Sequence, residues 1–187
     1  MLYTRRLPHW QPPDADFFIT WRLYGSLPRC KAPCTEMSPA RKFLAMDQQL
    51  HATTTGPRWL QDSRVADAVS QTLLAGAEVR DCYELAAWVV MPNHVHVLLS
   101  PRLPLRTVLM NIKSASARAA NELLGRKGQP FWQDESYDHW VRSDQERQRI
   151  IQYIEKNPVS AGLVASLEAW KWSSAGWAAH SAAPHSR

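Results

Sequence analysis

A chain of 187 residues with 45% hydrophobic content and nine tryptophans is long enough to bury one core of ordinary domain size. No run approaches the roughly 20 apolar residues that cross a bilayer, and no apolar core follows the first arginines, so we expect a cytoplasmic protein rather than a membrane-bound or exported one. The net charge of +5 favours polyanionic partners, but a charge of this size does not by itself select nucleic acid.

The first part of the chain is predicted to contain an arm, a strand and a loop. Residues 1–16 are rich in proline and basic side chains, which is typical of an extended arm. The aromatic and β-branched run over residues 17–24 predicts a strand that stops at Gly25. Cys30 and Cys34 follow in a loop. They could bind a metal ion, but the sequence has no second close pair of cysteines to complete a four-thiolate zinc site. Two reduced thiols are therefore the simpler interpretation.

Two helices and a hairpin are predicted next. Ser38 followed by a proline is a helix-start signal, and a second helix is predicted from Asp62 onwards. Residues 83–91 are almost continuously apolar, as expected of a strand that is buried on both faces. After a Pro-Asn turn signal, residues 94–99 alternate in polarity like the second strand of a hairpin.

The C-terminal half is predicted to contain two more helices and a strand. Residues 105–124 place their apolar side chains on one helical face, and residues 136–142 are predicted to form the last strand. Ser143 begins a capping-box pattern, so a helix should start there. That helix should end near Asn157, because the proline that follows cannot continue it. The tail after Ser173 is predicted to be disordered.

A pair of histidines could bind a metal ion. His94 and His96 are two residues apart on a predicted strand, so both side chains project from the same face. Two neighbouring imidazoles can chelate one metal ion. A histidine pair on a strand is, however, more often a surface or hydrogen-bonded pair, and the spacing alone does not define a metal site.

A tyrosine on the helix after Ser143 could act as a nucleophile. Tyr153 has Asn157 four residues later, on the same helical face. A phenol can attack a phosphodiester if a cation stabilises the developing charge, and an amide oxygen could complete the shell of that cation. The alternative from this helix alone is a core tyrosine packed beside its isoleucine neighbours.

Basic and aromatic residues suggest a surface for unpaired nucleic acid. The helix over residues 105–124 carries a polar face, and aromatic side chains further along the chain could stack on bases. Solvated helix faces look similar, so this signal is not specific. The residues that we expect to contact DNA are Lys113, Arg118, Asn121 and Arg142.

Two long segments carry a family resemblance. They are Trp88–Leu99, with the sequence WVVMPNHVHVLL, and Tyr153–Val164, with the sequence YIEKNPVSAGLV. Together with shorter pieces in the same order, they resemble the REP-associated tyrosine transposases, a branch of the single-tyrosine HUH transposases. The resemblance predicts one domain over residues 17–175, with the arm 1–16 before it and the disordered tail 176–187 after it.

The resemblance implies a fold and a role for individual residues. The fold of the family is α+β, an antiparallel sheet with helices packed on one face, related to ferredoxin-like and RRM-like folds. His94 and His96 match the two metal-binding histidines of the family motif, and Tyr153 matches the nucleophile. Asn157 matches the amide-bearing position that supplies a further metal ligand.

The expected activity is cleavage and rejoining of single-stranded or hairpin-associated DNA, with Mg²⁺ or Mn²⁺ as cofactor. Tyr153 would form a 5′-phosphotyrosine link and leave a free 3′-hydroxyl. We expect a monomer, with a dimer that exchanges its tyrosine helices as the alternative. Two other functions stay open: a hairpin-binding regulator without catalysis, and a metal-dependent phosphodiesterase that uses water.

Overall fold

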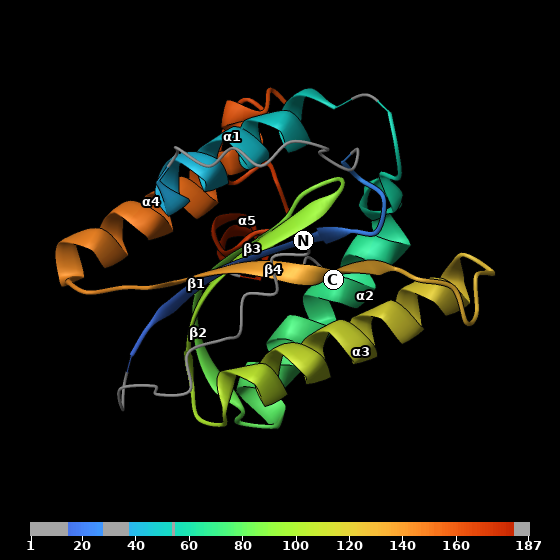
Figure 1. Ribbon diagram of the computed structural model, residues 1–187, viewed down its shortest axis with the longest axis horizontal. Coiled ribbons are helices and arrows are strands. Elements are labelled where there is room, and N and C mark those ends of the chain that lie inside the picture. Colours follow the sequence, from blue (N-terminus) through green and yellow to red (C-terminus); the bar gives the residue numbers. More distant parts are fainter. Residues whose placement is uncertain (1–14, 28–37, 54, 182–187) are drawn as a thin grey trace, which may run out of the picture.

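The computed structural model describes residues 15–27, 38–53 and 55–181. Their four strands form one antiparallel sheet in the order β2-β3-β1-β4 (Figure 1). The strands are β1 (Phe17–Leu23), β2 (Tyr83–Val90), β3 (His94–Pro101) and β4 (Trp132–Trp140). Each helical connection passes over one strand of the sheet, as in the β-α-β-β-α-β arrangement of ferredoxin-like folds. The predicted α+β class with an antiparallel sheet is therefore confirmed.

Helices cover both faces of this sheet (Figure 1). The α-helices among the described residues are α1 (Pro39–Ala52), α2 (Ser63–Leu74), α3 (Leu105–Leu123), α4 (Asp144–Ser160) and α5 (Ser174–Ser181). Helices α2 and α3 pack on one face, and α1 and α4 lie over the other. The second helical layer goes beyond the expectation of helices on a single face, and it covers the other face of β1 and β3.

Alternation along the strands produces two separate cores. In β1, Phe17, Ile19 and Trp21 point into the core under α2 and α3, whereas Phe18 points into the smaller core under α1 and α4. The smaller core contains Phe18, Phe43, Ala87, Val89, Met91, Leu98, Val141 and Ile154. Since both faces of β2 and β3 are covered, their almost continuous apolar sequence is explained.

The start of β4 and the end of α4 differ from the predicted boundaries. Strand β4 begins at Trp132 rather than at residue 136, because Trp132 still pairs with Leu23 beyond a register shift. Helix α4 continues through Pro158 to Ser160 rather than ending near Asn157. The proline lies in the last turn, where its missing N–H removes one intrahelical bond, and the carbonyl of Asn157 still accepts from the N–H of Ala161 at 2.9 Å.

The predicted disordered tail is wrong for its first part, which forms α5. The hydroxyl of Ser173 accepts from the N–H of Gly176 at 3.1 Å and so caps the helix, and Trp177 of α5 lies beside Trp88 of β2. The arm over residues 1–14, the loop with Cys30 and Cys34 and the tail over residues 182–187 fall outside the described residues.

In the part of the chain that the structure describes, none of the helices has both the length and the apolar character that crossing a membrane requires.

Candidate metal and tyrosine site

Three elements bring polar side chains together on the sheet face that α1 and α4 cover. Strand β3 contributes His94 and His96, which lie on the opposite side of the strand from the larger core. Helix α4 contributes Tyr153 and Asn157. The structure therefore places the predicted pair of histidines, the tyrosine and the asparagine in one chain and on one face of the sheet.

The two imidazoles face each other. Their Nε2 atoms are 3.0 Å apart, and both side chains are almost completely buried, with at most 1% exposure. The side-chain oxygen Oδ1 of Asn93 contacts Nδ1 of His94 at 2.7 Å, and the side-chain nitrogen Nδ2 of Asn93 donates to the backbone carbonyl of Leu50. This orientation of the amide makes Nδ1 of His94 the donor, so its Nε2 carries a lone pair in the neutral ring.

The second histidine is held in the same way. The hydroxyl of Thr20 lies 2.7 Å from Nδ1 of His96, which leaves Nε2 of His96 facing its neighbour. Burial, with the neighbouring His96 as a second cause, lowers the pKa of His94 well below its ordinary value. His94 is thus neutral near pH 7, which is the form that binds metal ions.

Helix α1 adds a carboxylate between the histidines and the tyrosine. Oδ1 of Asp47 lies 3.1 Å from Nε2 of His96 and 3.4 Å from Nε2 of His94. No hydrogen bond of acceptable geometry satisfies this buried oxygen within the described residues. The other oxygen, Oδ2, accepts a hydrogen bond from the hydroxyl of Tyr153. Asp47 therefore links the nucleophile candidate to the imidazole pair.

The charges of this cluster are set by its burial and by its neighbours. Burial opposes ionisation of Asp47, but His96 and His94 outweigh this effect, and the pKa of Asp47 lies below its ordinary value. Burial, followed by the negative charge of Asp47, raises the pKa of Tyr153. The cluster thus holds an ionised carboxylate and a protonated phenol at neutral pH.

A third histidine contacts the asparagine of α4. Nε2 of His51 lies 3.0 Å from the amide oxygen of Asn157 and 3.6 Å from Oδ2 of Asp47. Asp47, His51 and His94 each offer a ligand atom, and these atoms lie within 4.8 Å of one another.

These donors fit a divalent metal ion. The Nε2 atoms of His94 and His96 and an unsatisfied carboxylate oxygen converge on one small volume, where facing lone pairs would repel one another without a cation or a shared proton. Imidazole and carboxylate are both ligands of first-row divalent ions. The Nδ1 contacts of His94 and His96 are the outer partners that orient metal-binding histidines.

Two of these residues, Asp47 and His51, were missing from the sequence prediction. They are four residues apart on α1, between positions whose apolar side chains face the sheet. A polar pair at this spacing beside an inward apolar stripe was the available signal. Nothing local indicated that the pair would reach residues of β3 and α4.

Two of the residues expected to contact DNA have partners within the chain. The ammonium of Lys113 donates to the carbonyl oxygens of Gln133 and Asp134 at 2.7 and 2.9 Å. The amide nitrogen of Asn121, 7% exposed, donates to the carbonyl of Gln129. Both lie on α3, which packs on the sheet face opposite the histidines. Contact of these two residues with DNA stays a prediction.

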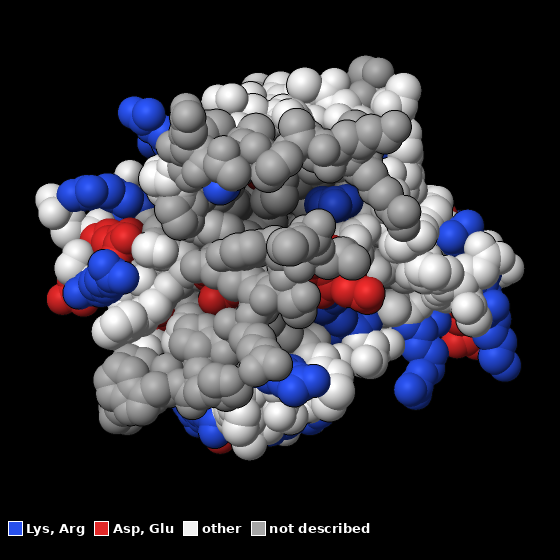
Figure 2. Space-filling view, viewed as in Figure 1, with Lys and Arg blue, Asp and Glu red and all other residues white. Residues whose placement is uncertain are grey.

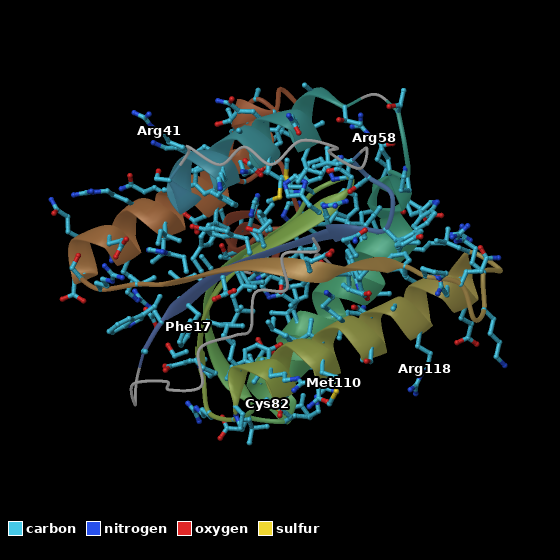
Figure 3. The ribbon with its side chains drawn as sticks, viewed as in Figure 1. Phe17, Arg41, Arg58, Cys82, Met110 and Arg118 are labelled. Atoms are coloured by element: carbon cyan, nitrogen blue, oxygen red, sulfur yellow. The ribbon has the colours of Figure 1, made fainter. Side chains whose placement is uncertain are left out.

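The other two are at the surface. Arg118 points away from the sheet on the outer side of α3 (Figure 3) and lines a cavity of about 240 Å³ together with Arg80. The guanidinium of Arg142 lies 5.7 Å from the centre of the Trp140 ring at the start of α4. Figure 2 shows Lys and Arg side chains near the start of α4 and around α3, with acidic side chains among them.

Comparisons with known proteins identify relatives of this chain. Residues 57–157 match the family described as "Transposase IS200 like". The chain is 29% identical over 96 residues to the REP-associated tyrosine transposase of Escherichia coli (strain K12), in a match that covers 49% of this chain and 53% of that protein. It thus spans about half the length of this curated relative. The resemblance inferred from the sequence motifs is confirmed.

A solved structure supports the fold. It is described as a REP-associated tyrosine transposase bound to a REP hairpin, and it superposes with a TM-score of 0.59 over 97% of this chain and 89% of that chain at 18% identity. The segment that matches the family contains both facing histidines, Tyr153 and Asn157. Because this segment is more than half of the chain, the protein belongs to the IS200-like transposase family.

Proposed function

We propose that this protein cleaves and rejoins single-stranded DNA beside hairpins, with Tyr153 as the nucleophile and a divalent metal ion as cofactor. The observation that supports this most directly is the link from the Tyr153 hydroxyl through Asp47 to Nε2 of both facing histidines. Membership of a transposase family supports DNA processing as the general activity.

The chain's own residues divide the chemistry between them. The phenol of Tyr153 gives up its proton as its oxygen forms a bond to phosphorus, and the bond from phosphorus to the 3′-oxygen breaks. The leaving 3′-oxygen takes up one proton, so the products are a 5′-phosphotyrosine and a 3′-hydroxyl, with no net change in protons. The reverse attack by a 3′-hydroxyl joins strands without ATP.

The metal ion would be held by His94 and His96 with an oxygen ligand from a facing helix, for which the sequence prediction is Asn157. When bound, Mg²⁺ or Mn²⁺ supplies polarisation of the scissile phosphate and stabilises the charge that develops on it.

The DNA partner and the oligomeric state belong to the same proposal. The structural neighbour was solved with a REP hairpin, which supports hairpin-associated DNA as the substrate. We propose the cytoplasm as the place of action. Since both facing histidines and Tyr153 meet within one chain, we favour a monomer whose tyrosine acts in cis over a dimer that exchanges tyrosine helices.

The test is covalent capture of the substrate. The full chain is incubated with Mn²⁺ and a labelled hairpin that carries a single-stranded flank, and the products are separated under denaturing conditions. We expect a protein–DNA adduct for the wild type, none for Tyr153→Phe, and none for the wild type with a chelator. Arg64→Ala, which removes only a surface side chain paired with Asp62, serves as a folded control and should form the adduct.

Other outcomes would identify the competing functions. Hairpin binding that survives Tyr153→Phe and His94→Ala, with no adduct in any sample, would identify a regulator without catalysis. Free cleaved DNA that never becomes linked to the protein would identify water as the nucleophile.

A further inference from the structure

We propose that Asp47 of α1, rather than Asn157 of α4, supplies the oxygen ligand of the metal centre, and that the same carboxylate positions the hydroxyl of Tyr153 beside it. This inference rests on the metal-dependent function proposed above. It assigns to α1 a role in the active site that neither the sequence motifs nor the matched family segment contain, because the match begins at residue 57.

The position of Asp47 carries the first half of the inference. Oδ1 is within 3.1 Å and 3.4 Å of the two facing Nε2 atoms and has no hydrogen-bond partner of acceptable geometry among the described residues, although the side chain is only 5% exposed. A buried carboxylate oxygen without a partner is costly. A cation bound between this oxygen and the two imidazoles would remove that cost.

Asn157 is engaged elsewhere. Its amide oxygen lies 3.0 Å from Nε2 of His51, and the residue is 2% exposed. Among the described residues, no hydrogen bond joins this oxygen to either of the facing histidines. We therefore assign to Asn157 the role of a positioning residue that holds His51, and through it α1, against α4.

The chemistry of the two oxygens favours the same assignment. Mg²⁺ and Mn²⁺ prefer hard, anionic oxygen ligands. Uncharged imidazole ligands compensate neither of the two positive charges of such an ion, whereas a carboxylate compensates one of them. The amide oxygen of Asn157 carries no charge. In a buried site this difference favours the carboxylate strongly.

The second half of the inference concerns Tyr153. Its hydroxyl donates to Oδ2 of Asp47, while Oδ1 of the same residue faces the imidazoles. One side chain thus fixes the distance between the nucleophile and the metal ligands. Loss of the carboxylate should therefore have two effects that can be measured independently, a lower affinity for the metal ion and a displaced Tyr153 hydroxyl.

The metal-affinity test uses the full chain without DNA, with Mn²⁺ binding measured by titration calorimetry and by the electron paramagnetic resonance of free Mn²⁺. We expect affinity to fall about 10- to 100-fold or more in Asp47→Asn, by analogy with losses seen for metal-site partners, and to change less than about threefold in Asn157→Ala. Gln48→Ala, an exposed neighbour on α1, is the matched control.

The outcomes separate this inference from the proposed function. Normal affinity in Asp47→Asn with a large loss in Asn157→Ala would overturn the ligand assignment and leave the metal centre intact. Wild type that does not bind Mn²⁺, or His94→Ala that binds it normally, would overturn the metal centre itself. Circular dichroism of each variant, and recovery of affinity in Asp47→Glu, distinguish a lost ligand from a misfolded chain.

The positioning role is tested by single-turnover adduct formation at saturating Mn²⁺. Asp47→Asn keeps a side-chain oxygen that can accept the hydrogen bond from the Tyr153 hydroxyl, whereas Asp47→Ala does not. We expect Asp47→Asn to form the adduct at least about ten times faster than Asp47→Ala. If saturating metal restored both variants to the wild-type rate, Asp47 would be a ligand only, and its positioning role would be overturned.

Discussion

Asn93, in the turn between β2 and β3, fixes the protonation pattern of the histidine pair. Its amide nitrogen is bound by the carbonyl of Leu50 on α1, so its oxygen must accept from His94. From the sequence, the Pro-Asn pair predicted only a turn, and no role for the side chain of Asn93. The structure shows that the turn residue also orients a metal-ligand candidate, as second partners of metal-binding histidines do.

Burial of neutral His94 should make the protein's stability depend on pH. The folded-state pKa of His94 lies below the value of about 6.5 for an exposed imidazole. Below that pH the unfolded chain binds a proton that the native state does not, so the free energy of unfolding should fall as pH decreases. Urea unfolding between pH 7.5 and 5.5, with chelator present, should show this fall, at no more than about 1.4 kcal/mol per pH unit for one proton.

Two histidine variants decide whether His94 is the source. His94→Gln removes the buried imidazole and should flatten the pH dependence, whereas His180→Gln, an exposed histidine of α5, should leave it unchanged. An equal slope in wild type and His94→Gln would contradict the assignment.

The start of α4 determines where Tyr153 lies, and a capping box holds it. The hydroxyl of Ser143 accepts from the N–H of Glu146 at 3.2 Å, and the carboxylate of Glu146 accepts from the N–H of Arg142 at 2.8 Å. The sequence predicted this box. In the structure the glutamate reaches the residue before the cap, and its second oxygen contacts His139 of β4 at 2.8 Å, which joins the helix start to the sheet.

Removal of this cap should destabilise the chain and leave the chemistry in place. Ser143→Ala should lower the free energy of unfolding by about 1 kcal/mol, because the N–H of Glu146 loses its partner. Urea unfolding measures the loss, and Ser143→Asp, which keeps a capping oxygen, should restore most of it. Unchanged stability in Ser143→Ala would mean that the sheet contacts alone fix the start of α4.

At the scale of the whole molecule, Arg118 and the candidate site lie on opposite faces of the sheet. Arg118 is on the outer side of α3, across the sheet from the facing histidines (Figure 3). Arg142 is at the start of α4. If both contact one DNA molecule, the DNA must extend around the edge of the sheet that β4 forms.

Hairpin binding should therefore depend on salt, and Arg118 should account for part of that dependence. For single strands, each phosphate contact contributes a slope of about −0.7 to the plot of log affinity against log salt concentration. Arg118→Ala should weaken binding and reduce the slope by about this amount. Fluorescence anisotropy over a salt series measures both.

Arg64 provides the matched control for this prediction. Its guanidinium is paired with Asp62 at 2.6 Å, so Arg64→Ala should leave the salt slope unchanged. If the two arginine variants gave the same slope as wild type, the outer side of α3 would not contact the DNA.

The sequence alone determined features that depend on neighbouring residues. Strand alternation placed His94 and His96 on one face, helical spacing placed Tyr153 above Asn157, and the cap at Ser143 set the start of α4. Each follows from backbone geometry over a few residues. The boundary at Pro158 was wrong because the tertiary contacts of α4 outweighed one lost hydrogen bond.

The tertiary structure decided which residues meet. Asp47 contacts Tyr153, and His51 contacts Asn157, across separations of 106 residues in the chain. No local pattern in α1 records this, because its polar pair satisfies helix geometry equally well whether it faces solvent or the sheet. The packing of α1 over β3 and α4 buries the pair, and burial turns an ordinary helix face into part of the site.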